Sequence, residues 1–287
     1  MHDIFYFTDV HGQLDLFQTM RDWCYKQDPE CMIIYGGDAC DRGDYGYDIM
    51  QMILDDPHMV YLKGNHEDLF VKAAREIAEM FDDVYNHPHT LQDAQNILEG
   101  TCFFHNTALH IYNGGNPTLL AWLLDGASKK FVDDIDNLPL VFSTDTCDFC
   151  HAGGGWKAFD EVSKAAYEGR KPNAFAADAM IWDRDHLNIG WKKDRILIHG
   201  HTPTCLLHPK LRTPEDTIKP VAWQGLTSKE AYPGWRIDMD TGMTWTGRGY
   251  VLNVLTMIVT GFWDHDVGIV ARPKAPVEQE FEKFKII

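Results

Sequence analysis

Residue types that bind divalent metals gather in five short clusters of the sequence, and each cluster directly follows a short apolar run. Carboxylate, imidazole and carboxamide side chains together suit metals such as manganese, iron or zinc. Several such sets, with one central carboxylate available to bridge them, predict a site for two metal ions. In chain order the clusters are Asp9-Val10-His11, Asp38, Asn65-His66, His151 and His201.

Each cluster alone is a weak signal. An Asp-x-His tripeptide in a turn is usually a capped loop, and a lone histidine at the end of a strand is usually a surface residue or a satisfied core residue. In the first cluster, however, Asp9 and His11 share one side of an extended segment, because side chains two residues apart share a face. Five clusters that all follow predicted strands therefore favour one shared site.

The apolar runs themselves predict the elements that position these clusters. They are short, they end in polar, glycine-rich turns, and they are typical of buried strands, at residues 4–7, 32–35, 59–62 and 196–198. Helical patterns at 14–25 and 46–54 separate the first three strands, which indicates right-handed βαβ units and a partly parallel sheet. Ligands of such sheets gather beyond the carboxyl ends of the strands, where the clusters lie.

The rest of the chain predicts a single domain, residues 1–287, of mixed α/β class. A helical insertion at about residues 70–130 is indicated by helical patterns at 68–80, 90–98 and 118–124. The segment from Pro203 to Gly225, with four prolines, is predicted to be a long surface loop. Further strands are predicted at 140–142, 149–152, 235–239, 250–257 and 268–271.

Composition excludes several classes of protein. The 287 residues carry 26 Lys+Arg against 43 Asp+Glu, a formal net charge of −17, and such a surface repels a nucleic-acid backbone. No apolar run reaches the roughly 18 residues that a membrane helix needs, and the first residues do not resemble an export signal. We therefore expect a cytoplasmic protein with no nucleic-acid or membrane partner. The seven cysteines are expected to be free thiols, and the CxxC of Cys147 and Cys150 lacks the second pair of a zinc site.

Taken together, the motifs resemble those of the calcineurin-like metallophosphoesterases, and more narrowly those of the phosphoprotein phosphatase family, especially its small bacterial and phage (lambda-type) members. The resemblance runs from about residue 3 to residue 255, and the insertion has no counterpart in it. It implies two mixed β-sheets packed face to face with flanking helices. The motifs that carry it are Asp9-Val10-His11-Gly12, Gly37-Asp38-Ala39-Cys40-Asp41-Arg42-Gly43, Gly64-Asn65-His66-Glu67, His151-Ala152-Gly153 and Gly200-His201.

The resemblance also implies a ligand set for two divalent metal ions, with manganese expected and iron or zinc as alternatives. One ion would be held by Asp9, His11 and Asp38. The other would be held by Asp38, Asn65, His151 and His201, so that Asp38 bridges. In this family a bridging hydroxide is the nucleophile, since two cations lower the pKa of a bound water toward neutrality.

Four further residues receive roles from the same resemblance. His66 matches the general acid that protonates the leaving alkoxide, and Asp41 matches the carboxylate that orients it. Arg42 matches one phosphate-binding arginine, whose planar fork suits bidentate contacts. Arg184 is assigned as the second phosphate-binding arginine. The alternative is that Arg184 is a surface arginine between two aspartates, in which case Arg170 or Arg195 would take the role. His199 is expected to contact the metal ligands without being one itself. Cys40 is expected to be a packed thiol. Asp240-Thr241-Gly242 resembles the segment that closes the site in this family.

The function that follows is a metal-dependent phosphomonoesterase, most simply a protein serine/threonine phosphatase of broad specificity. Its partners would be a phosphorylated protein or a small phosphate ester. One alternative is a symmetrical dinucleoside tetraphosphate hydrolase of the same superfamily, against which Asp41-Arg42-Gly43 and Glu67 stand. The other is a catalytically inactive scaffold that binds phosphorylated partners, against which the complete ligand set and His66 stand.

Overall fold

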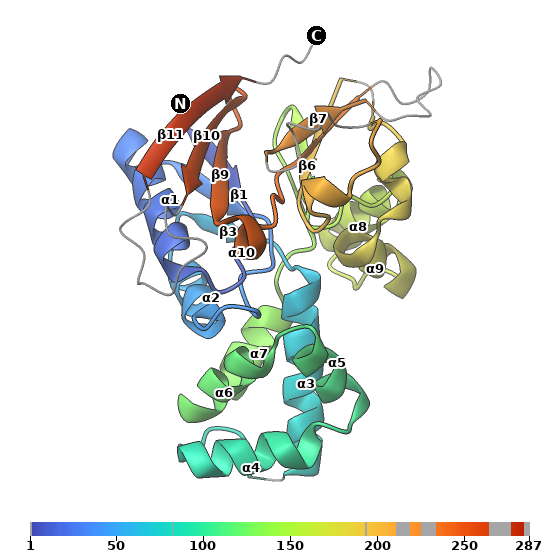
Figure 1. Ribbon diagram of the computed structural model, residues 1–287. Helices are drawn as coiled ribbons and strands as arrows, with labels where there is room; N and C mark the ends of the chain where they lie inside the picture. The colour runs from blue at the N-terminus through green and yellow to red at the C-terminus, as the bar shows by residue number, and fades with distance from the viewer. Residues whose placement is uncertain are drawn as a thin grey trace.

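Two mixed β-sheets pack face to face and are flanked by helices, as the computed structural model shows (Figure 1). The structure describes residues 2–81, 83–192, 194–210, 219–224, 234–263 and 277–283. This arrangement confirms the predicted fold class. The interface between the sheets is apolar, and in it the ring of Tyr6 stacks on that of Phe149 with centroids 5.6 Å apart.

The first sheet contains the predicted βαβ units. Strands β1, β2 and β3 run parallel, and helices α1 (Leu14–Gln27) and α2 (Gly46–Leu54) connect them. Strands β9, β10 and β11 extend the sheet with antiparallel pairs. The strand order is β11 (Val277–Lys283), β10 (Ile258–Trp263), β9 (Arg248–Asn253), β1 (Ile4–Phe7), β2 (Met32–Tyr35) and β3 (Met59–Tyr61).

The second sheet has a parallel centre, in which β5, β6 and β8 lie side by side. Helices α8 (Trp156–Tyr167) and α9 (Ala174–Trp182) and the 3-10 turn η1 (Asp185–Asn188) connect β5 to β6. Its strand order is β4 (Val141–Ser143), β5 (Cys147–Cys150), β6 (Ile196–His199), β8 (Trp235–Asp238) and β7 (Val221–Trp223). Five of the parallel strands, namely β1, β2, β3, β5 and β6, end at the loops that carry the five clusters.

A lobe of five helices projects from the sheets in Figure 1, in the region of the predicted insertion. Its core contains the buried rings of Phe70, Trp122 and Phe131. Sequence reasoning missed two of the helices, α5 and α7, and began α3 three residues late. The helices are α3 (Asn65–Met80), α4 (Leu91–Thr101), α5 (His105–Tyr112), α6 (Asn116–Leu124) and α7 (Lys129–Asp136).

Other predicted elements also need correction. The strand predicted at 250–257 is wrong in its second half, because Oδ1 of Asn253 accepts the backbone N–H groups of Leu255 and Thr256 and stabilises a turn before β10. The predicted surface loop at 203–225 contains a 3-10 turn η2 (Thr204–Leu206) and the edge strand β7. Helices α8, α9 and α10 (Met243–Thr246) were not predicted, and the strand predicted at 268–271 lies outside the described residues.

The cysteines are free thiols, as predicted, and Cys147 and Cys150 are buried on β5. Among the helices of the described residues, none combines the length and the apolar character that crossing a membrane requires.

Phe70→Ala is expected to lower the free energy of unfolding by about 3–5 kcal/mol, because it leaves a cavity in the centre of the lobe. The ring of Phe70 is fully buried and lies 5.9 Å from that of Trp122 and 5.8 Å from that of Phe131. Urea unfolding measures the change. Phe103→Ala is the matched control, because Phe103 is 89% exposed. Equal stability of the two variants would show that the lobe has no well-packed core.

Candidate active site

The site is built from unusual backbone. Six residues that are not glycine have a positive φ in the loops that carry the clusters, and such conformations cost roughly 1–3 kcal/mol each for most residues. A concentration of strained residues at the carboxyl ends of the strands indicates a functional site. The residues and their φ values are Asp9 (56°), His11 (44°), Asp38 (57°), Asp41 (69°), Arg42 (65°) and His201 (70°).

Glu67 holds the turn that carries Asp38. Its carboxylate accepts the backbone N–H groups of Asp38, Ala39 and Gly64, each at 2.8 Å, and the hydroxyl of Tyr61 at 2.7 Å. The side chain is completely buried, so these four donors compensate for the loss of water. Sequence reasoning gave Glu67 no role, although a glutamate three residues after the start of a helix is a recognised capping signal.

The carboxylate of Asp38 lies among the imidazole rings of three histidines. Its Oδ1 is 3.3 Å from Nε2 of His151, and its Oδ2 is 3.6 Å from Nε2 of His11 and 3.8 Å from Nε2 of His66. Two groups that could hold a metal ion therefore share this carboxylate, namely His11-Asp38-His66 and Asp38-His151-His201. The sharing agrees with the predicted bridging position.

Backbone carbonyls orient the ligand imidazoles. Nδ1 of His11 is 2.9 Å from the carbonyl of Cys40, and Nδ1 of His151 is 2.8 Å from the carbonyl of Gly36. A carbonyl only accepts, so each Nδ1 donates to its carbonyl and each Nε2 is directed toward the site. A neutral imidazole with a free lone pair is the form that binds a metal.

Asn65 joins the second group. Its Oδ1 is 3.1 Å from Nε2 of His151 and 2.8 Å from Nδ1 of His201. Nε2 of His201 is buried and has no hydrogen-bond partner among the residues that the structure describes. Three of the residues predicted for the second ion, together with the shared Asp38, are thus brought together.

Asp9 joins the first cluster to the loop of His201. Its carboxylate accepts the hydroxyl of Thr8 at 2.7 Å and the backbone N–H of His201 at 3.2 Å. The two compact groups do not include Asp9, and the first of them includes His66. It still lies close enough to Asp38 for their charges to interact.

The shifted pKa values of the site residues agree with a site that binds a cation. Burial raises the pKa of Asp9, and the charges of Asp240 and Asp38 raise it further. Burial and the charge of Asp38 raise the pKa of Asp240 to about 6. Burial lowers the pKa of His151, but the carboxylates of Asp38 and Asp9 raise it to about 10. Buried carboxylates that repel one another, beside an unpartnered imidazole nitrogen, match the donor set of divalent metals.

His66 and Asp41 form a buried pair. Nδ1 of His66 is 2.7 Å from Oδ2 of Asp41. Burial lowers the pKa of His66, but Asp38 and Asp41 outweigh burial and raise it. Burial raises the pKa of Asp41, but the charges and hydrogen bonds of His110 and His66 hold it well below the usual range. His110 was not predicted to be near the site, and no local pattern in the sequence indicates it.

Arg42 is an exposed residue beside this pair. Its Nη1 donates to Nε2 of His11 at 2.7 Å, and its Nη2 donates to Nε2 of His66 at 3.0 Å. Its backbone N–H donates to the carbonyl of Gly114 in the helical lobe at 2.9 Å. The planar guanidinium therefore lies at the solvent side of the ligand groups, where a bidentate anion could meet it.

Arg184 is also exposed and lies on the side of the second group. Its charge lowers the pKa of His201, after the larger effects of burial and of His151. The two substitutes are engaged elsewhere, since Arg170 pairs with glutamates 161 and 168 and Arg195 pairs with Asp148. The structure thus favours Arg184 over both of them.

Two side chains next to the site, those of His199 and Cys40, are buried. His199 is fully buried against the ring of Trp223, and burial and Arg236 lower its pKa to about 3. Cys40 is fully buried, and burial and the charge of Asp41 raise the pKa of its thiol. A thiol with a raised pKa is unreactive, so Cys40 is a packing residue.

Arg42→Ala and Arg184→Ala are each expected to lower kcat/KM for phosphate esters by roughly 10- to 100-fold, the scale of one or two charged hydrogen bonds. Metal content should not change, because neither side chain is a ligand. Steady-state kinetics and elemental analysis measure the two quantities. Arg170→Ala is the control, because this exposed arginine pairs only with glutamates on the surface. Wild-type kinetics of Arg184→Ala would remove Arg184 from the site.

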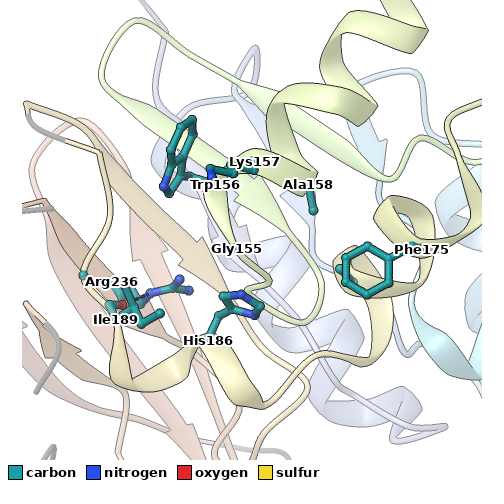
Figure 2. Close-up of a pocket in the computed structure, with 10 residues that line it drawn as sticks. Gly155, Trp156, Lys157, Ala158, Phe175, His186, Ile189 and Arg236 are labelled. Atoms are coloured by element: carbon teal, nitrogen blue, oxygen red, sulfur yellow. Dashed lines mark hydrogen bonds between the residues drawn. The ribbon is translucent and has the colours of Figure 1, made fainter. Parts of the chain in front are cut away.

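A separate cavity of about 310 Å³ lies beside α8 and α9, and none of its lining residues is a predicted site residue. Figure 2 shows the side chain of Arg236 directed toward His186, with Phe175 across the cavity. Arg236 donates to the carbonyls of Gly153, Gly154 and Ile189. Its role is therefore to hold the glycine run that follows His151.

Residues 2–205 match the sequence model of the calcineurin-like phosphoesterases, and the chain belongs to this family. Members are metal-dependent hydrolases of phosphate esters that normally bind two divalent metals, in agreement with the His/Asp groups of the site. A comparison with curated protein sequences gives no match.

Solved structures with related folds are distant in sequence. A proposed diadenosine tetraphosphatase aligns over 97% of this chain and 94% of its own, with 12% identity and a TM-score of 0.45. A cold-active protein-tyrosine phosphatase of the psychrophile Shewanella sp. aligns over 92% and 78%, with 13% identity and a TM-score of 0.47. A protein serine/threonine phosphatase from Saccharomyces cerevisiae with similarity to human phosphatase PP5 aligns over 99% and 80%, with 12% identity and a TM-score of 0.43. These likenesses do not distinguish among substrates.

Proposed function

We propose that this protein is a phosphomonoesterase, and within that class a protein serine/threonine phosphatase of broad specificity. The observation that carries the proposal is the pair of His66 and Asp41 next to two ligand groups that share Asp38. A proton donor for an alkoxide is needed when the leaving group is basic, as in phosphoserine and phosphothreonine.

The metal-binding part of the proposal assigns six ligands. When bound, two divalent ions supply an activated water as the nucleophile and positive charge that stabilises the phosphate. Manganese as the native metal and a cytoplasmic location belong to the same proposal. The residues that would hold the ions are Asp9, His11, Asp38, Asn65, His151 and His201.

The chain's own side chains bind and orient the ester. Arg42 and Arg184 would hold the phosphate oxygens from two sides of the ligand groups. The N–H groups of Arg42 now meet the lone pairs of His11 and His66, and a phosphate that attracts the guanidinium would release Nε2 of His66. His66, with its Nδ1 held by Asp41, would then take up a proton from water at the released Nε2 and deliver it to the leaving oxygen.

A substrate screen tests this function. The purified protein, chelated and then loaded with manganese, is offered a phosphoserine peptide, a phosphotyrosine peptide and diadenosine tetraphosphate. We expect the highest kcat/KM for the phosphoserine peptide and activity on phosphotyrosine as well. A preference for diadenosine tetraphosphate would favour the dinucleotide hydrolase. Binding of phosphopeptides without turnover of any ester would identify a scaffold.

A further inference from the structure

His110 is a buried histidine of the helical lobe to which neither the metal-binding residues nor the phosphate-binding residues assign a role. It lies on α5, its side chain is completely buried, and its Nε2 is 2.9 Å from Oδ1 of Asp41. The other oxygen of Asp41 is 2.7 Å from Nδ1 of His66. One carboxylate therefore connects a histidine of the lobe to the histidine beside the ligand groups.

The direction of the hydrogen bond follows from the partners. An ionised carboxylate only accepts, so Nε2 of His110 carries the proton and donates to Oδ1 of Asp41. Nδ1 of His110 is buried without a hydrogen-bond partner among the described residues. The hydroxyl of Thr118, on α6, donates to the same Oδ1 at 2.8 Å. The lobe thus supplies two donors to one oxygen.

Residues of the lobe pack closely around the ring of His110. A Cβ atom at Gly115 would lie 2.3 Å from Nε2 of His110, so any larger residue there would displace the ring. The ring of Phe70 meets that of His110 edge to face, with centroids 6.2 Å apart. The carbonyl of Gly114 accepts the backbone N–H of Arg42. The lobe therefore holds both the side chain of Asp41 and the backbone that follows it.

We propose that His110 is a positioning residue, which fixes the rotation of the Asp41 carboxylate so that Oδ2 stays directed at His66. The last torsion of an aspartate is broad and has no strong preference of its own. Donors on Oδ1 therefore decide where Oδ2 points. The proposal rests on the proposed function of His66 as the proton donor. It gives the helical insertion a part in the chemistry as well as in the shape of the site.

Kinetics of two variants test the role. His110→Leu removes the donor and is expected to lower kcat on a phosphoserine peptide by about 10- to 100-fold, the usual effect of losing an outer partner of a site residue. KM and metal content should stay as in wild type. The loss should be smaller on p-nitrophenyl phosphate, whose phenolate leaves without a proton. His110→Gln keeps a donor and should recover most of the activity.

The matched control is His105→Gln, which changes an exposed histidine of the same helix and should have no effect. A loss in His110→Leu that is equal on both esters would overturn the proposal, because a general structural defect does not depend on the leaving group. So would a failure of His110→Gln to recover activity in a folded protein with both metals.

Proton NMR of the protein loaded with zinc, which is diamagnetic, provides a readout that does not need activity. The Nδ1 proton of His66, in its hydrogen bond to Asp41, is expected as a protected downfield signal. His110→Leu should broaden or shift it, and His110→Gln should retain it. An unchanged signal in His110→Leu would overturn the proposal. If the two variants change the His66 signal as expected but the wild-type protein hydrolyses no phosphate ester, the proposed function is contradicted and the positioning role is still supported.

Two more variants apply if His110→Leu does not fold. Thr118→Val removes the second donor to Oδ1 with little change of shape, and Gly115→Ala displaces the ring of His110 without removing a polar group. Each is expected to show the same dependence on the leaving group, with a smaller loss. Equal losses on both esters in both variants would overturn the proposal.

Discussion

Removal of divalent metals by chelation is expected to abolish phosphate ester hydrolysis, and added manganese is expected to restore it. The ligand atoms of two groups converge on Asp38, and the buried carboxylates around it repel one another without positive charge between them. Activity and elemental analysis of the same samples measure the effect. Full activity in a protein shown to be free of metal would refute the two-metal interpretation.

Among single ligand changes, Asp38→Asn is expected to have the largest effect. Asp38 is the member that both groups share, so the amide removes one negative charge from both positions at once. We expect the loss of at least one equivalent of metal together with turnover. Asp22→Asn, which changes an exposed aspartate of α1, is the control. Retention of two metals and of normal turnover in Asp38→Asn would show that the bridging role is wrong.

His66→Asn is expected to lower turnover of a phosphoserine peptide by roughly 10²–10⁴-fold, the usual contribution of a general acid. Both metals and phosphate binding should remain. The loss should shrink for p-nitrophenyl phosphate, because its leaving group is stable as an anion. A plot of kcat against the pKa of the leaving group, for wild type and variant, measures this difference.

Asp41→Asn should show the same pattern as His66→Asn in a milder form, since an amide can orient the ring but cannot stabilise its charge. An equal loss on all esters in His66→Asn would mean that His66 acts by position or charge alone. The loss of a metal in that variant would make His66 a ligand, a role that its place in the His11-Asp38-His66 group permits.

The parts of the fold with a local pattern were predicted from the sequence. Strands β1 and β2 and helix α2 have the predicted bounds, because short buried runs and a clear helical period mark them. Helix α9 was missed because its apolar residues show no amphipathic period, since the exposed Phe175 is as apolar as the buried Met180 and Ile181. The short helix α5 is stabilised by packing in the lobe, which a local pattern does not show. Helix α7 was missed although Ser128 caps it and Phe131, Val132 and Ile135 form a buried apolar face.

In the candidate site, too, the residues with a local sequence pattern were predicted and those without one were missed. The residue types of the ligand clusters follow predicted strands, so the topology of parallel strands brings them to one edge. The contact of His110 with Asp41 joins residues 69 positions apart in the chain, and nothing in the sequence near either residue marks it.

The left-handed backbone of the site residues has a consequence for sequence drift. Glycine adopts a positive φ without strain, so replacing Asp9, Asp41 or His201 by glycine removes a conformational penalty while it removes a functional group. The hydrogen bonds that the side chain accepts, as at Asp41, offset part of this gain in stability, and selection for activity opposes each replacement. In related chains that have lost catalytic activity, we expect glycine at some of these positions.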